Sequence, residues 1–427
     1  MGSLTRSTKV FTHFIERERG PRIQANDLIQ PMMTEPIGEP TGIYVAMAIF
    51  AWNEERAIGA TIRSLFQQSV FSELHRRGQR CEVWCVTNGC TDQTAAVAEA
   101  MLGQQANDHP CASSFTARVC DLRERGKVNA WNQFVHSRSA REARFLFMMD
   151  ADILIHQPET LWNMLQLLEA DPEAHVAVDR PCKDIRFKGR KSFRDKLSLA
   201  AAQGTLAAEA QLCGQLYGIR AEVARSLYLP KDLAACEDGF IKALVCTDRL
   251  THATWPGRIR VAANAEHTFE AYTSPVAILK NQKRQIIGQT IVHILLDHEL
   301  ERLSISERQQ LADTLRRRDA ADPFWLKRLI GEHLRRTRFC WRLHPGLLGL
   351  RFQRLRRLGP WARIAGLPAA VAGFCAALAA SFLAWRSLRS GCTDYWPRAP
   401  RAERESEPTG PGAQRDPAAG VVGGSMN

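Results

Sequence analysis

The stretch Arg144-Phe-Leu-Phe-Met-Met-Asp150-Ala-Asp152-Ile-Leu-Ile155 decides the fold of this chain. An apolar run of this length, following a helical pattern, is typical of a strand buried on both faces of a parallel sheet. The two aspartates stand at its carboxyl end, where open α/β sheets bind their ligands. Carboxylates are rarely buried unless they are paired or bind a metal. The pattern therefore indicates a hard divalent cation shared with substrate phosphates, although a turn with two solvated aspartates would also produce it.

The composition of the chain favours a folded protein with acidic partners. Its 427 residues carry a formal net charge of +12, with an apolar fraction of 45% and a charged fraction of 24%. These fractions predict one large domain with an appendage, or two domains. The positive charge suits nucleotide diphosphates, anionic lipid headgroups or nucleic acid. We expect no nucleic-acid binding, because the basic residues are not interleaved with aromatic residues along one element.

The twelve cysteines are scattered, with no C-x-x-C and no paired spacing typical of zinc sites. Several, such as Cys85 and Cys246, lie in apolar runs, where a free cysteine behaves as a small buried hydrophobic residue. This usage fits a reduced, cytosolic environment. The N-terminus has no apolar segment of the kind found in signal peptides, so we expect none.

Strand and helix patterns alternate along the first part of the chain. Residues 42–50, 81–87 and 115–120 are apolar runs typical of strands, and a helical pattern follows each of them. Such alternation predicts βαβ units and a mostly parallel, doubly wound sheet. Polar residues follow three of the strands, namely Asn53, Glu54, Asn88, Asp92, Asp150 and Asp152. One cleft at the carboxyl edge of the sheet would bring all six together.

The C-terminal part contains a possible membrane segment. Gly346–Gly359 interleaves leucine with arginine, as a basic interfacial helix does. Ile364–Trp385 then runs 22 residues without a charge, which is long enough to cross a bilayer, but alanine dominates it and Pro368 interrupts it. A spanning or re-entrant helix and a buried or surface helix both fit this pattern. From Ser390 onward, proline, glycine and charged residues predict a disordered tail.

Taken in order, the motifs of residues 42–290 resemble a family 2 glycosyltransferase of the GT-A fold. The matching pieces are Ala51-Trp-Asn-Glu-Glu55, Asn88-Gly-Cys-Thr-Asp92, Gly126-Lys-Val-Asn-Ala-Trp-Asn132, Asp150-Ala-Asp152 and Glu237-Asp238. Each piece is weak alone, but five in sequence on the expected strand ends form a specific signal. The resemblance covers somewhat more than half of the chain. It implies an α/β fold with a mostly parallel sheet flanked by helices, followed here by a helical and membrane-associated extension.

The resemblance also implies roles for individual residues. The loop and turn that hold the base and ribose of the nucleotide would contain Ala51, Asn53, Glu54, Asn88 and Asp92. Lys127 would face the nucleotide, where a cation at a helix start suits phosphate; a plain surface cap is the alternative. Asp152, with Asp150, would bind the Mn²⁺ or Mg²⁺ ion that bridges the two phosphates.

The resemblance implies that the acidic pair Glu237-Asp238 is catalytic. Asp238 would be the general base that deprotonates an acceptor hydroxyl for attack with inversion, and Glu237 would assist or orient the site. An ordinary acidic pair at a helix start, favoured by the helix dipole, is the alternative. Two further candidates are His267, as a third metal ligand or a structural histidine, and Arg284, as a phosphate clamp or a solvated helix residue.

Two departures from the family pattern bear on specificity. Many relatives have an acidic residue before the glycine of the second motif to meet the base, whereas this chain has Asn88, which weakens the expectation of uridine. Processive members carry Gln-x-x-Arg-Trp, whereas this chain has Asn281-x-x-Arg284-Gln285. With at most one membrane segment, this predicts transfer of a single sugar rather than extrusion of a polymer.

The sequence therefore predicts an inverting glycosyltransferase that uses a nucleoside-diphosphate sugar, with a lean toward UDP. Its acceptor would be a lipid-linked or cell-envelope glycan at the cytoplasmic face of a membrane, and the chain would be single-pass or peripheral. A nucleotidyltransferase of similar fold and a catalytically silent, membrane-associated nucleotide-sugar-binding protein are the alternatives. The predicted divisions are an arm at 1–41, a GT-A catalytic domain at 42–290, a charged and amphipathic helical region at 291–360, a membrane helix at 361–389 and a disordered tail at 390–427.

Overall fold

The computed structural model describes most of the chain from residue 42 to residue 391. The described residues are 42–187, 211–233, 235–271, 274–337, 339–340, 343, 355–356 and 359–391. The predicted arm at 1–41 and nearly all of the predicted tail lie outside the described residues. So does most of the basic helix predicted at 346–359.

Seven strands form one mixed sheet in the order β3-β2-β1-β4-β6-β5-β7. β1 pairs in parallel with β2 and β4, β2 with β3, and β5 with β7, whereas β6 runs antiparallel to β4 and β5. The strands are β1 (Ile43–Ala51), β2 (Arg80–Asn88), β3 (Phe115–Leu122), β4 (Phe145–Asp150), β5 (Val176–Lys183), β6 (Leu216–Arg220) and β7 (Ile259–Phe269). The predicted α/β architecture with a mostly parallel sheet is confirmed.

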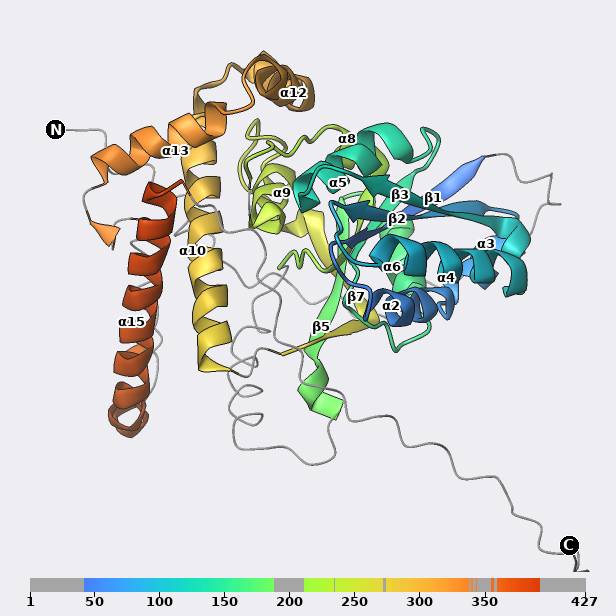
Figure 1. Ribbon diagram of the computed structural model, residues 1–427, viewed down its shortest axis with the longest axis horizontal. Helices are drawn as coiled ribbons and strands as arrows, with labels where there is room; N and C mark the ends of the chain where they lie inside the picture. Colours follow the sequence, from blue (N-terminus) through green and yellow to red (C-terminus); the bar gives the residue numbers. More distant parts are fainter. Residues whose placement is uncertain are drawn as a thin grey trace, which may run out of the picture.

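Helices cover both faces of the sheet (Figure 1). Those that follow the first strands and β4 are α2 (Ile58–Phe66), α3 (Val70–Arg76), α4 (Thr94–Asp108), α5 (Lys127–Gln133) and α6 (Thr160–Ala170). The later ones are α8 (Ala221–Arg225), α9 (Glu237–Cys246), α10 (Pro275–His298), α11 (Ile305–Gln309), α12 (Leu311–Ala321), α13 (Trp325–Arg336) and α15 (Pro360–Arg389).

The alternation of side chains along β4 explains why an unbroken apolar run was needed. Phe145, Phe147 and Met149 belong to the core on the face covered by α2, α3, α4 and α6. Leu146 and Met148 belong to the core on the opposite face, which α5, α9 and α10 cover. Successive strand residues point to opposite faces, so a strand between two helical layers must be apolar at every position.

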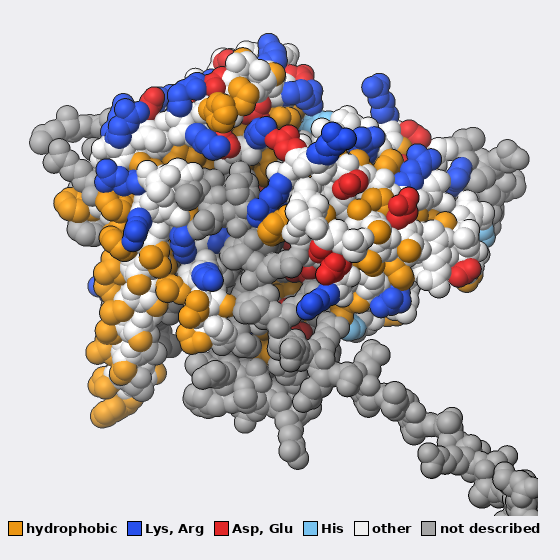
Figure 2. Space-filling view, viewed as in Figure 1, with side chains coloured by type: hydrophobic (Ala, Val, Ile, Leu, Met, Phe, Trp, Pro, Cys, Tyr) orange, Lys and Arg blue, Asp and Glu red, His pale blue; other side chains and the backbone are white. Residues whose placement is uncertain are grey.

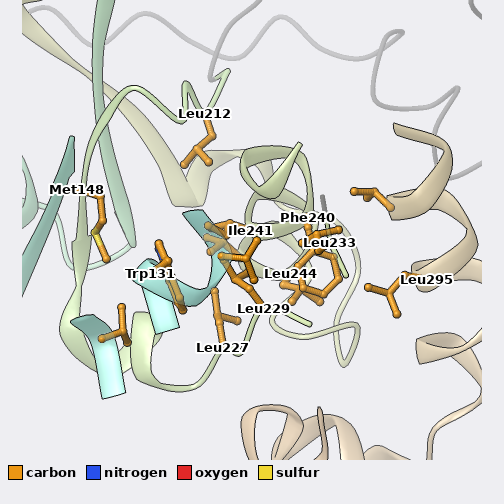
Figure 3. Packing of buried hydrophobic residues seen from close by; sticks show 14 of the residues in the cluster. Trp131, Met148, Leu212, Leu227, Leu229, Leu233, Phe240, Ile241, Leu244 and Leu295 are labelled. Atoms are coloured by element: carbon orange, nitrogen blue, oxygen red, sulfur yellow. The ribbon is translucent and has the colours of Figure 1, made fainter. Parts of the chain in front are cut away.

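The core on the face covered by α5, α9 and α10 extends from the sheet into the C-terminal helices. Figure 3 shows Trp131 of α5, Ile241 and Leu244 of α9, and Leu295 of α10 in one packed region. The same core includes Ala380, Ala384 and Leu388 of α15. The C-terminal helices therefore share a core with the sheet, and α10 runs without a break across the division predicted at 290/291.

The apolar segment predicted at 361–389 forms a helix, α15, which lies beside α10 in Figure 1. Within the part of the chain that the structure describes, one stretch, Ala370–Arg389, is long and apolar enough to cross a membrane. However, 39% of its most apolar window is buried inside the protein. The helix is confirmed, and its relation to a membrane stays a prediction.

His136 is a partly buried histidine in the π-helical turn Phe134–Arg138, directly after α5. Its Nε2 lies 2.9 Å from the carbonyl oxygen of Leu227. Burial, with the charge of Arg316, lowers the pKa of His136 to about 4. The folded protein therefore holds a neutral imidazole at pH values where an unfolded chain would protonate it.

We expect the protein to lose stability as the pH falls from about 6.5 toward 4, because the unfolded state then binds a proton that the folded state excludes. His136→Gln should remove this contribution, since the amide can donate to Leu227 but does not titrate. In urea titrations, the free energy of unfolding should fall between about pH 7 and about pH 4.5 by roughly 1 kcal/mol more in the unchanged protein than in the variant. Equal losses in the two proteins would contradict this assignment.

Candidate active site

A largely buried lysine, whose side chain is 15% exposed, joins three elements at the carboxyl edge of the sheet. Lys127, the first residue of α5, places its Nζ 2.6 Å from Asp150 Oδ1 and 2.9 Å from Glu237 Oε1. The same nitrogen donates a hydrogen bond of 2.9 Å to the carbonyl oxygen of Gly214. Asp150 ends β4 and Glu237 opens α9, so one ammonium group connects β4, α5 and α9.

The pKa values of this cluster follow from its burial and charge. Burial alone would lower the pKa of Lys127, but the carboxylates of Asp150 and Glu237 outweigh it and hold the pKa above its ordinary value. Burial raises the pKa of Asp150 to about 6, against the opposing effect of Lys127. Burial also acts to raise the pKa of Glu237, yet Lys127 and Arg284 keep it below its ordinary value. Lys127 therefore keeps charge on carboxylates that burial would otherwise neutralise.

Asp238 lies beside this cluster and is half-buried. Its Oδ1 accepts a hydrogen bond of 2.8 Å from the backbone N–H of Gly239. Burial and the neighbouring carboxylate of Glu237 raise the pKa of Asp238. A carboxylate with an increased proton affinity, at the start of a helix and next to an ionised group, is suited to accept a proton.

Asp152 and His267 lie on segments that run next to each other. Asp152 is exposed, two residues beyond β4, and Leu154 forms a β-bridge with Thr268 of β7. His267 is fully buried, with its Nδ1 2.7 Å from Asp179 Oδ2 and its Nε2 3.4 Å from Gln215 Oε1. The carboxylate of Asp179 is the kind of partner that orients a metal-binding histidine, and the other ring nitrogen lies beside Gln215 in this structure.

The residues fit a divalent cation that is held partly by substrate. Among the described residues, no group of three or more His, Cys, Asp or Glu side chains could hold a metal ion by itself. Mg²⁺ and similar ions commonly take one or two carboxylates and complete their shell with water and substrate phosphates. Lys127 already pairs with Asp150, so the exposed Asp152 is the carboxylate best placed to meet such an ion.

The loop after β1 and the turn after β2 are tied together by side chains. Asn53, which has a left-handed backbone with φ of 55°, accepts a hydrogen bond of 2.6 Å from the Thr91 N–H and donates one of 3.1 Å to Thr91 Oγ1. The Glu54 N–H donates to Thr94 Oγ1 at 2.7 Å. These bonds form within the protein itself, so the two segments are held together independently of any ligand.

Asn88 and Asp92 take part in the same framework. Asn88 is buried; its Nδ2 donates to the Ala51 carbonyl oxygen at 2.8 Å and its Oδ1 accepts from the Gly126 N–H at 3.2 Å. Asp92 accepts from the backbone N–H of Thr94 at 3.1 Å. Asp92 also accepts from the Glu55 N–H at 3.4 Å, so both side chains join the loops at this edge, and their direct contact with a nucleotide stays a prediction.

Residues 47–214 match the family model described as Glycosyl transferase family 2. The match covers about two fifths of the chain and includes four of the five ordered motifs, all but Glu237-Asp238. The chain is accordingly a transferase enzyme, and the resemblance inferred from the ordered motifs is confirmed. No curated protein matches the chain.

Two solved glycosyltransferases show a distant likeness. One is glucosyl-3-phosphoglycerate synthase from Mycobacterium tuberculosis, at 18% identity and a TM-score of 0.39, covering 60% of this chain and 80% of that one. The other is TarS (residues 1–349) from S. aureus, at 15% identity and a TM-score of 0.38, covering 82% and 91%. Complexes of the synthase contain Mn²⁺ or Mg²⁺ with UDP. Likeness at this level does not carry a substrate over to this chain.

Two residues that the sequence did not single out lie beside the framework of the glycosyltransferase domain. The guanidinium carbon of Arg125 lies 3.6 Å from the centre of the Trp52 ring. Gly89, with φ of 68°, packs so tightly here that a Cβ would lie 2.9 Å from the Arg125 side chain. The sequence signal for this stack was Trp52, an aromatic residue directly before the polar stretch Asn53-Glu-Glu55. The stack provides a flat surface near the residues predicted to hold the base.

Arg284 lies on α10 near the acidic pair. Its charge lowers the pKa of Glu237 and opposes the rise in the pKa of Asp238, so it is close to both. It is half-buried rather than on an open helix face. The structure thus brings Arg284 to the site, and its contact with phosphate stays a prediction.

The turn before α9 depends on a close approach by α10. Cys236 has a left-handed backbone with φ of 60°, which is uncommon for a residue other than glycine. A Cβ at Gly288 would lie 2.5 Å from Cys236 Sγ and 2.8 Å from the backbone of Ala235. Only glycine therefore allows α10 to pack here, and this packing fixes where Glu237 and Asp238 begin their helix.

Lys127→Met should leave the carboxylates of Asp150 and Glu237 buried without their cation. Removing one partner of a buried ion pair costs about 3–5 kcal/mol, and we expect a loss of that size in the free energy of unfolding, measured with urea at neutral pH. Lys231→Met is the matched control, because its ion pair with Glu124 is half-exposed and should be worth less than about 1 kcal/mol. Similar losses in the two variants would show that the buried pairs do not hold this edge together.

Gly288→Ala should displace the turn that carries Glu237 and Asp238, because the added methyl group meets the backbone of Ala235. A displacement of about 1 Å can reduce a rate by roughly 10²-fold, so we expect kcat to fall at least tenfold while UDP affinity changes little. Gly331→Ala in α13 is the control, since a Cβ there meets nothing within 4 Å. Unchanged kcat in Gly288→Ala, or equal loss of UDP affinity, would contradict a positioning role.

Proposed function

We propose that this enzyme transfers one sugar from a UDP-linked donor to a hydroxyl group of a lipid-linked or cell-envelope glycan, with inversion, at the cytoplasmic face of a membrane. The observation that carries the proposal is the position of Asp238. It stands next to the buried cluster of Lys127, Asp150 and Glu237, at the carboxyl edge of a family 2 glycosyltransferase sheet.

The charge of the site supports the use of Mn²⁺ or Mg²⁺. Four carboxylates gather there, those of Asp150, Asp152, Glu237 and Asp238, whereas the cationic side chains near them are Lys127 and Arg284. The excess of negative charge would repel a diphosphate unless a cation lay between them. Asp152 and His267 would hold this ion. When bound, it neutralises charge that develops on the leaving diphosphate.

Asp238 serves as the general base in this proposal. One of its oxygens accepts from the Gly239 N–H, and the other can receive the proton of the acceptor hydroxyl. Glu237 stays ionised through Lys127 and raises the proton affinity of its neighbour. Glu237 therefore orients Asp238 and raises its pKa, whereas Asp238 itself contacts the reacting hydroxyl.

The donor nucleotide would lie along the loops that Asn53 and Thr91 tie together. The Trp52–Arg125 stack offers a flat surface for a base, and stacking tolerates any base. Asn88 is engaged with Ala51 and Gly126, so the preference for uridine would come from backbone groups of these loops. Arg284 is placed to meet phosphate, and the sequence Asn281-x-x-Arg284-Gln285 favours transfer of a single sugar.

The donor can be tested by calorimetry with UDP, GDP and dTDP, each with and without Mn²⁺. We expect UDP to bind only with Mn²⁺, and Asp152→Ala to reduce this binding at least tenfold, because one ligand of the ion is lost. Asp108→Ala, which removes an exposed aspartate at the end of α4, serves as the control. Binding of UDP that is equally strong without metal would contradict the metal site, and absence of any binding would favour the silent binding protein.

The base can be tested with Asp238→Asn and the release of UDP from UDP-sugars in the presence of membrane extract. General base catalysis contributes about 10²–10⁴-fold, so we expect a loss of that size in kcat with unchanged UDP affinity. In the unchanged enzyme, kcat should rise with pH through the raised pKa of Asp238, because only the ionised carboxylate accepts a proton. Release of pyrophosphate from a nucleoside triphosphate would instead identify a nucleotidyltransferase.

A further inference from the structure

The helix α15 has two different apolar faces. One face packs against the rest of the protein through Ala370, Ala377, Ala380, Ala384 and Leu388. The other face is exposed, and we call it the α15 stripe. It comprises Trp361, Ile364, Leu367, Val371, Cys375, Phe382 and Leu383. The packed face accounts for the fold of α15, but among the described residues no element covers the α15 stripe.

The α15 stripe is continuous along the helix. From Trp361 to Phe382 its residues recur at spacings of three, four or seven, and Leu383 follows directly, so they lie on one side of the helix. Trp361 is 84% exposed and Ile364 is 67% exposed at one end, and Phe382 is 49% exposed near the other. From Trp361 to Leu383 the stripe is about 33 Å long. Figure 2 shows hydrophobic side chains along the visible length of α15 at the lower left, and Val276 and Ile278 at the start of α10 are also exposed.

The surrounding sequence has an unusual charge. Residues 333–393 contain eleven arginines and no lysine, aspartate or glutamate. This segment therefore supplies nearly all of the net charge of +12 of the chain. Of these arginines, Arg356, Arg363, Arg386 and Arg389 are exposed and stand at the two ends of the stripe. An apolar stripe with arginine at its ends matches an anionic bilayer, in which hydrocarbon lies beneath negative headgroups.

We infer that α15 is an in-plane membrane anchor. The α15 stripe enters the boundary between headgroups and acyl chains of an anionic bilayer, the flanking arginines bind the headgroups, and Trp361 lies at the interface. The helix does not cross the membrane. The anchor deepens the proposed function, since it brings the site to a lipid-linked acceptor, but it acts independently of catalysis.

The packed face of α15 rules against a crossing orientation. α10 lies between α15 and the sheet in Figure 1, and α15 shares a hydrophobic core with it. A crossing helix would have to leave this core or take α10 into the bilayer. α10 carries Lys280, Lys283, Arg284 and Asp297, and charged side chains are costly in hydrocarbon. An in-plane helix keeps the packed face and covers the exposed one.

The same arrangement fixes how far the site lies from lipid. α10 packs on α15 and, through Gly288, on the turn that begins α9. Packed helices lie about 8–10 Å apart, so Asp238 lies on the order of 20 Å from the bilayer surface. A lipid-linked sugar that projects from the headgroup layer can reach this distance.

The anchor can be tested by flotation of the full chain with vesicles of phosphatidylcholine containing about one third phosphatidylglycerol. We expect binding that weakens with salt and is much lower on pure phosphatidylcholine. The double variant Ile364→Glu/Val371→Glu should lower the bound fraction at least tenfold. The matched control Ile305→Glu/Phe324→Glu, at residues 65% and 60% exposed outside the stripe, should bind as the unchanged protein does. Equal binding by both double variants would overturn the proposal.

The orientation can be tested with sealed vesicles and a membrane-impermeant thiol reagent. Arg356→Cys and Ser390→Cys place thiols at the exposed positions that flank α15, and peptide mass spectrometry locates the label. An in-plane helix leaves both sites reactive from outside. Protection of one site until detergent is added would show a crossing helix and overturn the proposal. Cys375, which is exposed on the stripe, should react more slowly when vesicles are present.

Two further outcomes separate this proposal from its rivals. If the stripe pairs with a second copy of the chain, light scattering without lipid will show a dimer that Ile364→Glu/Val371→Glu dissociates, and the unchanged protein will not float. Asp238→Asn should float as the unchanged protein does.

If sugar transfer is not found but flotation depends on the α15 stripe, the proposed function fails and the anchor stands. If transfer occurs without flotation, the anchor fails alone.

Discussion

The ammonium group of Lys127 is the constraint on which the active edge of this enzyme depends. Asp150 and Glu237 are both buried, and two buried carboxylates 2.6 Å and 2.9 Å from one lysine nitrogen are stable only with that charge between them. The lysine comes from α5 and the carboxylates from β4 and α9, so the site forms only when all three elements have docked. Its charge also keeps Glu237 ionised, which sets the proton affinity of Asp238. One interaction thus couples folding of the edge to the chemistry proposed there.

The sheet was predictable because its signals are local. The strand from 144 to 149, the earlier strands and the polar residues at their ends all follow from the period of apolar residues, and parallel pairing places those ends at one edge. The partner of a long side chain is not local. The motif Gly126-Lys127 predicts a cation at a helix start, but it does not reveal that the ammonium group contacts two carboxylates, because Glu237 is far along the chain. For the same reason, Asn88 and Asp92 could be placed at this edge of the sheet but not recognised as the groups that join its loops, through Ala51 and the Glu55 N–H.

The features that the sequence did not reveal arise from close approaches between distant segments. Gly288 is an ordinary helix interruption in the sequence, and its importance comes from the backbone of Ala235, which α10 approaches too closely for any side chain. Trp52 and Arg125 stack because two loops meet at the end of the sheet. Likewise, a division at 290 follows from the change in composition there, yet α10 continues through it because its apolar residues pack against α9 at one level and α15 at another.

This continuity of α10 links the two surfaces of the enzyme. A helix of 24 residues is about 36 Å long and stiff, and here it contacts both the turn that positions Asp238 and the packed face of α15. A surface that binds lipid through α15 therefore cannot shift relative to the base without disrupting a shared core. The C-terminal helices act as a rigid spacer rather than a tether, because a flexible linker would leave the distance from lipid to Asp238 unspecified. An acceptor held in a bilayer can diffuse sideways but cannot leave the membrane. The protein must therefore hold Asp238 at a fixed distance above the bilayer surface, and lateral diffusion brings the acceptor to it.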